Sequence, residues 1–399
     1  MIPFVSLALL GVLYAWATAS FPRLARRKRL VAAALAPLWL SQLLSYWLIG
    51  HEYDSTAPRM VVDLVMLPLL MAALPIGLVR MASWGAGALR ARLARRDHGV
   101  GDEARDDRAG DDAPDPAAAG DGITRRRLIE ATSGVALMGA TGSMLGWGIV
   151  RGRHAFELRE IAVPVAGLPR VLDGYAIAQV SDIHAGDYVG DRELDEGFAL
   201  VRAARPDLVV VTGDIVDFDA AFAPRVARKL VDLAPRDGVA AVLGNHDYYA
   251  DAERVARALR SGGVDLLVDE GRVVRPGDGG GFALLGVDDR WSSRYGRAGP
   301  RLDRAAASVP TDLARVLLSH QPVTVDRWPG KVALQLSGHT HGGQINPGFR
   351  PADLFLKYVA GPYQVGGTRL YVNRGFGTVG TPSRVGSPPE VTRIVLVAA

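Results

Sequence analysis

Five short polar motifs lie between residues 181 and 341, and each follows a short apolar run of β type. In order they are Ser-Asp-Ile-His at 181–184, Gly-Asp at 213–214, Gly-Asn-His-Asp at 244–247, Ser-His at 319–320 and Gly-His-Thr-His at 338–341. Because ligands of open α/β sheets lie beyond the carboxyl ends of the strands, we expect these motifs to converge on one rim. Carboxylate oxygens and imidazole nitrogens together suit a pair of divalent transition metals.

The runs ahead of the motifs have strand length, and helical patterns lie between them. The apolar runs are at 175–180, 208–211, 239–243, 316–318 and 332–336. Helices are expected at 192–205, 222–233 and 252–259. Alternating strands and helices predict a parallel sheet and therefore the α/β class. Gly-rich turns between 264 and 287 predict a change to hairpins there.

The joint arrangement carries the metal prediction, since each motif alone is weak. An Asp-x-His after a strand or a Gly-Asp turn occurs often by chance, and a lone histidine is usually structural. The chain has eight histidines, however, and five of them fall within these motifs. There is no cysteine, which excludes disulfides and thiolate chemistry. A net charge of +4 without a concentrated basic patch gives no indication of specific nucleic-acid binding.

Long apolar segments fill the first part of the chain. The candidate spans are residues 2–20, 30–50, 60–79 and 131–150, and Asp63 is the one charged residue among them. Each is close to the ~20 residues that cross a bilayer as a helix. A buried helical bundle is the alternative, but the basic flanks favour membrane spans. We therefore expect an all-α transmembrane section over 1–96 and a fourth, anchoring span within 125–154.

The distribution of arginine predicts the orientation of these spans. Basic residues fill the first loop and the stretch 80–127, which the positive-inside rule places in the cytoplasm. The residues after the fourth span would then be extracytoplasmic in a multi-pass protein of the cell membrane. Arg151, Arg153 and Arg159 lie on the unexpected side of this arrangement. The Asp-, Gly-, Ala- and Pro-rich stretch 97–124 reads as a disordered acidic linker.

The linker ends at Thr-Arg-Arg-Arg-Leu-Ile, residues 124–129, which resembles a twin-arginine export signal ahead of an apolar segment. An ordinary arginine cluster at a cytoplasmic helix end is the alternative. No small-x-small cleavage site precedes Arg151, so we expect the segment to be retained as an anchor.

In their order and spelling, the five motifs resemble the signature of the calcineurin-like metallophosphoesterase superfamily, D-x-H, GD, GNH[DE], H and GHxH. The resemblance covers roughly residues 170–398. The extended Gly-His-Thr-His-Gly-Gly-Gln at 338–344, with 371–375 and 389–391 downstream, is similar to the bacterial membrane-anchored or twin-arginine-exported branch of YkuE- and YaeI-like proteins. It implies a four-layer α/β/β/α sandwich over 155–399.

The resemblance also implies a role for each motif residue. The ligands of a first metal would be Asp182, His184 and His341. Those of a second metal would be Asn245, His320 and His339. Asp214 would bridge the two ions, which implies two divalent metals, Mn, Fe or Zn. His246 would be the spare imidazole that donates a proton to the leaving oxygen or stabilises developing charge, and Asp247 would orient it.

These roles imply a membrane-anchored phosphoesterase that cleaves phosphodiesters or phosphomonoesters by a metal-activated hydroxide. The partners would be a phosphoester substrate, with lipid-linked and cell-envelope compounds among the candidates, and membrane lipid. One alternative is a pyrophosphate hydrolase that acts on a nucleotide-diphosphate lipid. Another is a non-catalytic membrane sensor that binds phosphate ligands. Specificity lies in loops that no motif describes, so the substrate stays open.

Overall fold

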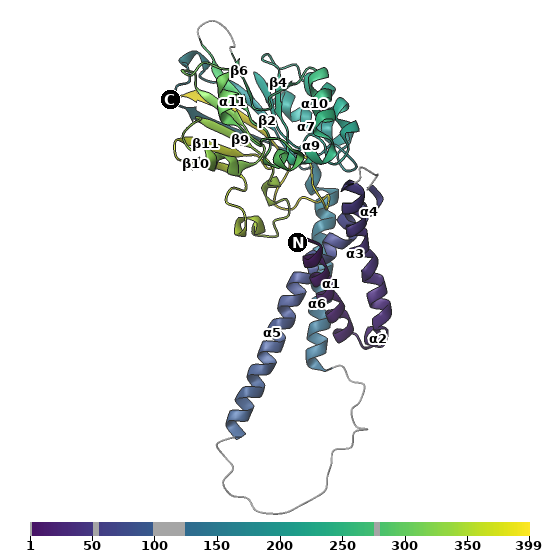
Figure 1. Cartoon of the computed structure of the whole chain (residues 1–399). Coiled ribbons are helices and arrows are strands. Elements are labelled where there is room, and N and C mark those ends of the chain that lie inside the picture. The colour runs from purple at the N-terminus through teal and green to yellow at the C-terminus, as the bar shows by residue number, and fades with distance from the viewer. Residues whose placement is uncertain (1, 51–55, 99–123, 275–279) are drawn as a thin grey trace, which may run out of the picture. The chain divides into compact units, whose positions relative to one another are not determined.

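A computed structural model describes residues 2–50, 56–98, 124–274 and 280–399 of the chain (Figure 1). The chain divides into two compact units, Met1–Met144 and Leu145–Ala399. The predicted acidic linker falls almost wholly outside the described residues. The predicted domain borders at 96, 124 and 154 stay predictions.

Where it is described, the first unit consists of helices joined by short turns. Its elements are α1 (Ile2–Ser20), α2 (Pro22–Ala25), α3 (Lys28–Gly50), α4 (Thr56–Val61), the π-helical η1 (Val62–Met66), α5 (Leu67–His98) and the greater part of α6 (Arg125–Val150). Helical stretches long and apolar enough to cross a membrane are Lys28–Leu48, Thr56–Arg90 and Arg125–His154, with Phe4–Ser20 as a shorter apolar helix. The expected all-α section with apolar helices is therefore present.

The second unit contains two six-stranded sheets. The first has the order β1 (Glu157–Val165), β12 (Glu390–Ala398), β2 (Ala176–Val180), β3 (Leu208–Thr212), β4 (Val239–Val242) and β5 (Asp265–Leu266). The second has the order β10 (Gly361–Val365), β11 (Thr368–Val372), β9 (Leu334–Ser337), β8 (Arg315–Leu318), β7 (Phe282–Gly286) and β6 (Glu270–Val274). Pairing is parallel from β2 to β5 and from β7 through β8 and β9 to β11, whereas β6 pairs antiparallel with β7, as the hairpin prediction requires.

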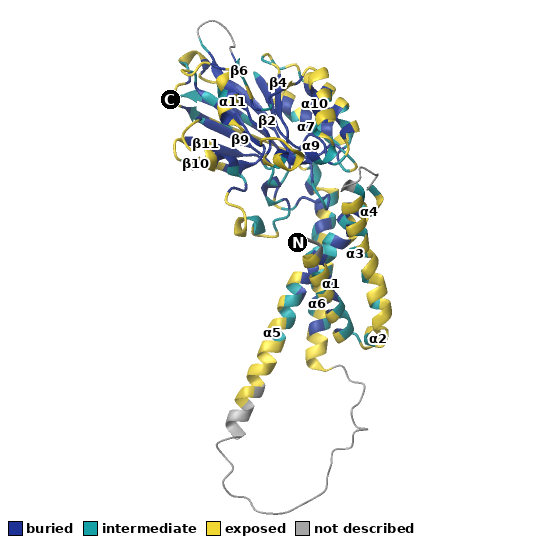
Figure 2. Cartoon of the chain, viewed as in Figure 1, coloured by how far each residue is buried: buried dark blue, intermediate teal, exposed yellow. Residues whose placement is uncertain are grey.

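Helices cover the outer faces of the two sheets (Figure 2). On the first sheet lie α7 (Asp191–Ala203), α8 (Ala223–Val231) and α10 (Ala252–Ser261), and on the second lies α11 (Leu302–Ala307). The strands β2, β3 and β4 are buried at every position, because each is covered on both faces. Their residues are almost all apolar, as expected of strands in a parallel sheet that is covered on both sides. One core fills the space between the sheets and another lies under the helices. This is the predicted four-layer α/β/β/α sandwich.

Candidate metal centre

The five motifs meet at one rim of the sandwich. They follow the last residues of β2, β3 and β4 in the first sheet and of β8 and β9 in the second. The predicted ligands at this rim are Asp182, His184, Asp214, Asn245, His320, His339 and His341. All are buried except His339, which is partly buried. The strand-end expectation from the sequence therefore holds, and the motifs of both sheets contribute to one site.

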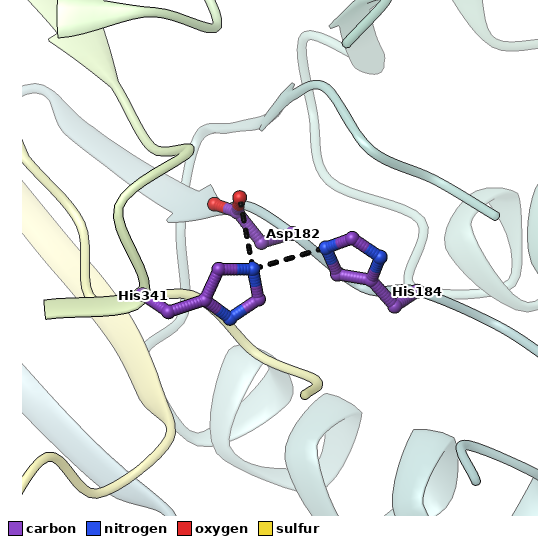
Figure 3. A group of neighbouring side chains, drawn as sticks. All are labelled: Asp182, His184 and His341. Atoms are coloured by element: carbon purple, nitrogen blue, oxygen red, sulfur yellow. Dashed lines mark hydrogen bonds and ion pairs between the residues drawn. The ribbon is translucent and has the colours of Figure 1, made fainter. Parts of the chain in front are cut away.

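The first group of donor atoms comes from Asp182, His184 and His341 (Figure 3). The Nε2 atoms of His184 and His341 are 3.0 Å apart, and His341 Nε2 lies 3.5 Å from Asp182 Oδ1. His184 Nε2 also lies 3.5 Å from Asp214 Oδ2. The three donor atoms lie within 4.8 Å of one another, and Asp214 Oδ2 adjoins them through His184.

The second group uses the same Asp214 oxygen. His320 Nε2 lies 3.2 Å from Asp214 Oδ2 and 3.1 Å from His339 Nδ1. It also lies 3.1 Å from Asn245 Oδ1, which brings in the one amide ligand predicted from the sequence. Asp214 Oδ2 is therefore common to both groups, as a bridging carboxylate would be.

These separations fit two ions. Donors that share one first-row metal at about 2.0–2.2 Å must lie about 3–3.5 Å from one another. Imidazole and carboxylate donors without a thiolate suit Zn, Fe or Mn. The residues present therefore fit the dinuclear centre that the resemblance implies, with three separate ligands for each ion and Asp214 between them.

The backbone at the site adopts the left-handed conformation, with positive φ, which residues other than Gly rarely adopt. Five of the seven predicted ligands have positive φ: Asp182 (53°), His184 (51°), Asp214 (52°), His339 (73°) and His341 (51°). Such residues cost on the order of 1–3 kcal/mol each and persist where the surrounding structure imposes them. In this chain they cluster where donor atoms converge, as expected of a site whose geometry is set before a ligand arrives.

Two motif glycines give the ligands room. A Cβ on Gly244 would overlap Asp214 Oδ1, and a Cβ on Gly338 would overlap Ser181 Oγ and Asp182 Oδ2. Because backbone and fixed carboxylates meet there, neither position has space for a side chain.

Gly338→Ala is therefore expected to displace Asp182, lower the metal content and reduce stability by about 1–3 kcal/mol, the usual cost of overpacking. Metal analysis and thermal unfolding of the full chain in detergent check this. Gly190→Ala is the matched control, because its Cβ would meet only Glu193 Oε2 at 3.7 Å. Equal metal content and melting temperature in Gly338→Ala and the unmodified protein would contradict the packing argument.

Charge and burial set the protonation of the imidazoles. Burial, together with the neighbouring His320 charge, lowers the pKa of His339 to about 3. Burial and the charges of His184 and Arg384 lower the pKa of His341 as well. Both rings are therefore neutral near pH 7, which is the form that binds metals. His320 differs, because Asp214 and Asp182 raise its pKa against the effect of burial; a metal ion there would displace a proton.

Outer contacts fix the orientation of the ligand rings. His320 Nδ1 lies 2.9 Å from the carbonyl of Thr212, to which it can donate, and this leaves Nε2 for a metal. His341 Nδ1 lies 3.3 Å from Nη2 of Arg384, a fully buried side chain that also donates to the carbonyls of Gly377 and Ser387. Burial lowers the pKa of Arg384 to about 9. The sequence analysis did not find Arg384, and its distance along the chain from the motifs leaves no local signal.

His246 is oriented by Asp217 rather than by Asp247. His246 Nδ1 lies 3.0 Å from Asp217 Oδ1 and 3.1 Å from the Asp217 carbonyl. The same Oδ1 lies 3.4 Å from His184 Nδ1, so Asp217 contacts the outer nitrogens of both rings. Hydrogen bonds from these imidazoles lower the pKa of Asp217 against the effect of burial.

The contact predicted between Asp247 and His246 is not among the hydrogen bonds of the described residues. Asp247 instead accepts from three backbone amides. Its Oδ1 accepts from Ile215 N (2.9 Å) and Val216 N (3.1 Å), and its Oδ2 accepts from Gly244 N (2.8 Å). Asp247 occupies the third position of the short helix α9 (Asn245–Ala250) and completes its capping. It therefore supports the loops that carry Asp214 and Asn245, a structural role next to the site.

Aromatic side chains adjoin His246. Its ring centroid lies 5.0 Å from that of Phe218 and 4.9 Å from that of Tyr249, and Tyr249 packs edge-on against Trp291 at 5.5 Å. Phe218, Tyr249 and Trp291 are all partly exposed. Ring faces of this kind accept planar or apolar groups next to a reacting centre.

Comparison with known proteins agrees with this geometry. A family model described as calcineurin-like phosphoesterase matches residues 175–343. The chain is 34% identical to the "Transmembrane protein with metallophosphoesterase domain" of Danio rerio over 63% of this chain and 60% of that protein. It is 30% identical to the "Uncharacterized metallophosphoesterase YkuE" of Bacillus subtilis over 69% of this chain and 98% of that protein. It is 29% identical to "Phosphodiesterase YaeI" of Escherichia coli over 69% of this chain and all of that protein.

Proposed function

Because the chain belongs to the calcineurin-like phosphoesterase family, we propose that it is a membrane-anchored hydrolase of phosphodiester or phosphomonoester bonds that uses two divalent metal ions. The observation that carries the proposal is that Asp214 Oδ2 lies within 3.5 Å of His184 Nε2 in the first donor group and of His320 Nε2 in the second. Mn, Fe and Zn are the candidate metals, on the nitrogen and oxygen donors present. The match covers 60% of the zebrafish relative, so the proposal concerns the catalytic unit first.

The chain's own residues divide the work of such a reaction. When bound, a pair of divalent ions activates a water molecule and neutralises phosphoryl charge. Asp182, His184 and His341 would hold one ion and the second ligand group the other. His246, with Nδ1 held by Asp217, keeps Nε2 for a substrate oxygen, where it donates a proton or stabilises negative charge.

A turnover assay tests the proposal. The full chain, purified in detergent and supplied with Mn, is expected to hydrolyse bis(p-nitrophenyl) phosphate or p-nitrophenyl phosphate. A chelator should abolish the reaction, and added metal should restore it. If the protein retains two ions per chain but cleaves no monoester, diester or pyrophosphate, the alternative of a phosphate-binding sensor is correct instead.

A second candidate is hydrolysis of the pyrophosphate in a nucleotide-diphosphate lipid. The aromatic group of Phe218, Tyr249 and Trp291 beside His246 favours it, because base stacking on such rings is worth about 1–3 kcal/mol per base. A larger kcat/KM for a nucleotide-diphosphate lipid than for the same lipid as a simple phosphate ester would select this substrate class. The lipid would be a membrane partner in that case.

The arginine asymmetry leads us to propose that the protein is multi-pass and that its catalytic unit is extracytoplasmic. A reporter active only after export, fused after Arg159, is expected to give signal, whereas a fusion within 97–122 should give none. The reverse pattern would place the site in the cytoplasm and change the class of substrates.

We further propose that the arginine triplet at 125–127 directs twin-arginine export. Replacing Arg125, Arg126 and Arg127 together by Lys is then expected to block export of the catalytic unit, as measured with the same reporter. All three must change, because either Arg125 and Arg126 or Arg126 and Arg127 can supply the twin-arginine pair. Undiminished export of the triple variant would leave ordinary insertion of an apolar helix as the explanation.

A further inference from the structure

The segment 346–358, between the last metal motif and β10, exposes a run of large apolar side chains. Phe349 is 62% exposed, Leu354 74%, Phe355 84% and Leu356 44%. The segment is not frayed, because it contains the short helix η9 (Pro351–Leu354). Scattered exposed apolar residues need no explanation, but a contiguous group marks a contact surface.

Both ends of this apolar loop are tied to the metal motif. Asn346 Nδ2 donates to the Gly342 carbonyl at 3.0 Å, and Thr340 Oγ1 donates to the Val359 carbonyl at 2.5 Å. Thr340 lies between His339 and His341. Whatever the loop docks on is therefore held close to the metal-binding rim.

The start of the apolar loop also lies beside the last turn of α6, which belongs to the same unit. Asn346 N donates to the Val385 carbonyl at 2.8 Å. The neighbouring Arg384 N donates to the Gly148 carbonyl of α6 at 3.3 Å, and Ser383 Oγ donates to the Leu145 carbonyl at 3.0 Å. In Figure 1 the loop is the yellow-green excursion on the side of the unit where this turn of α6 joins it.

The last turn of α6 contains residues that are typical of a membrane–water interface. The helical stretch Arg125–His154 is long and apolar enough to cross a bilayer. Trp147 is 55% exposed at its end, and Arg151 follows the helix. Tryptophan and arginine at a helix end are typical of the layer of lipid headgroups. If α6 crosses a bilayer, as the proposed membrane anchoring requires, the apolar loop begins near the point where the helix leaves the hydrocarbon.

We propose that the apolar loop 346–358 inserts Phe349, Leu354, Phe355 and Leu356 into the interfacial layer of the bilayer that α6 enters. Arg350 and Lys357 flank the residues from Leu354 to Leu356 in the sequence and pair with Asp353 and Asp326, and their long stems suit the headgroup level. The rim of His339 and His341 is then held at the lipid surface. This contact is independent of whether the site hydrolyses a phosphoester.

A single fluorescent label tests the contact, because the natural chain has no cysteine. Phe355→Cys, labelled with an environment-sensitive fluorophore in the full chain, is reconstituted in nanodiscs of phosphatidylcholine and phosphatidylglycerol. Replacing the phosphatidylcholine by its brominated form is expected to quench most of the emission. Arg257→Cys, exposed on α10, is the control and should lose little. Metal content of the labelled protein confirms folding, and Leu354→Cys repeats the test at a second exposed position.

Emission at position 355 that brominated lipid leaves unchanged, or reduces only as much as at position 257, would overturn the proposal. Blue-shifted but unquenched emission would overturn it too, since another protein surface, such as a second copy of the chain, would then cover the loop. Neither result depends on turnover, so failure of the proposed hydrolase function remains distinguishable.

Discussion

Asp214→Ala is expected to leave the protein with one metal ion or none and to reduce hydrolysis by more than the ~10–100-fold that loss of an outer-shell partner costs. Asp214 Oδ2 lies within 3.5 Å of both His184 Nε2 and His320 Nε2. Without its carboxylate, two cations would face each other unscreened across a site whose other predicted ligands are mostly buried. Loss of the carboxylate is therefore expected to weaken the binding of the second ion most.

Elemental analysis of the full chain, beside kinetics on a model diester, measures both effects. Asp219→Ala is the matched control, because Asp219 lies five residues further along and is exposed at the start of a 3₁₀ turn. The control should keep two ions and unchanged turnover. An Asp214→Ala protein with two ions and full activity would mean that the bridging assignment is wrong.

His246→Ala is expected to fail in a different way, with both ions retained and kcat lowered by about 10²–10⁴-fold. Asp217 holds the His246 ring nitrogen Nδ1. His246 belongs to neither of the two donor groups that adjoin Asp214, although its ring lies close to His184 and Asp217 as a third group. Removing the ring thus takes away a proton donor or a charge-stabilising group and no ligand.

The matched control is His154→Ala, which removes a partly buried histidine paired with Glu196, away from the motifs. It should leave kcat and metal content unchanged.

Asp217→Asn should keep the ions and shift the pH profile of kcat, because Asp217 orients His246 through Nδ1. Loss of metal from His246→Ala would move this histidine from catalyst to ligand.

The convergence of the predicted ligands could be foreseen because their motifs lie at the ends of buried strands. Residues such as Asp182 and His320 follow β2 and β8 directly, and the geometry of parallel sheets brings those ends to one rim. The long-range pairing of β1 with β12 and of β12 with β2 was not predictable, since no local pattern specifies it.

The sequence also could not show which carboxylate, that of Asp217 or that of Asp247, contacts the His246 ring. Asp247 follows His246 directly, but helix capping turns its carboxylate toward the amides of Gly244 and Val216. Asp217 lies 29 residues away and reaches the ring because the residue before it, Val216, bridges to Ala185 beside His184. Arg384 likewise reaches His341 only through the folding of the last loops.

Anomalous X-ray diffraction from Mn-loaded crystals tests the central claim most directly. The account predicts two anomalous peaks about 3.5–4 Å apart, the separation that two-metal hydrolysis requires. One peak should adjoin Asp182, His184 and His341, and the other Asn245, His320 and His339, with a carboxylate oxygen of Asp214 between them. A single peak, or two peaks without Asp214 between them, would contradict it.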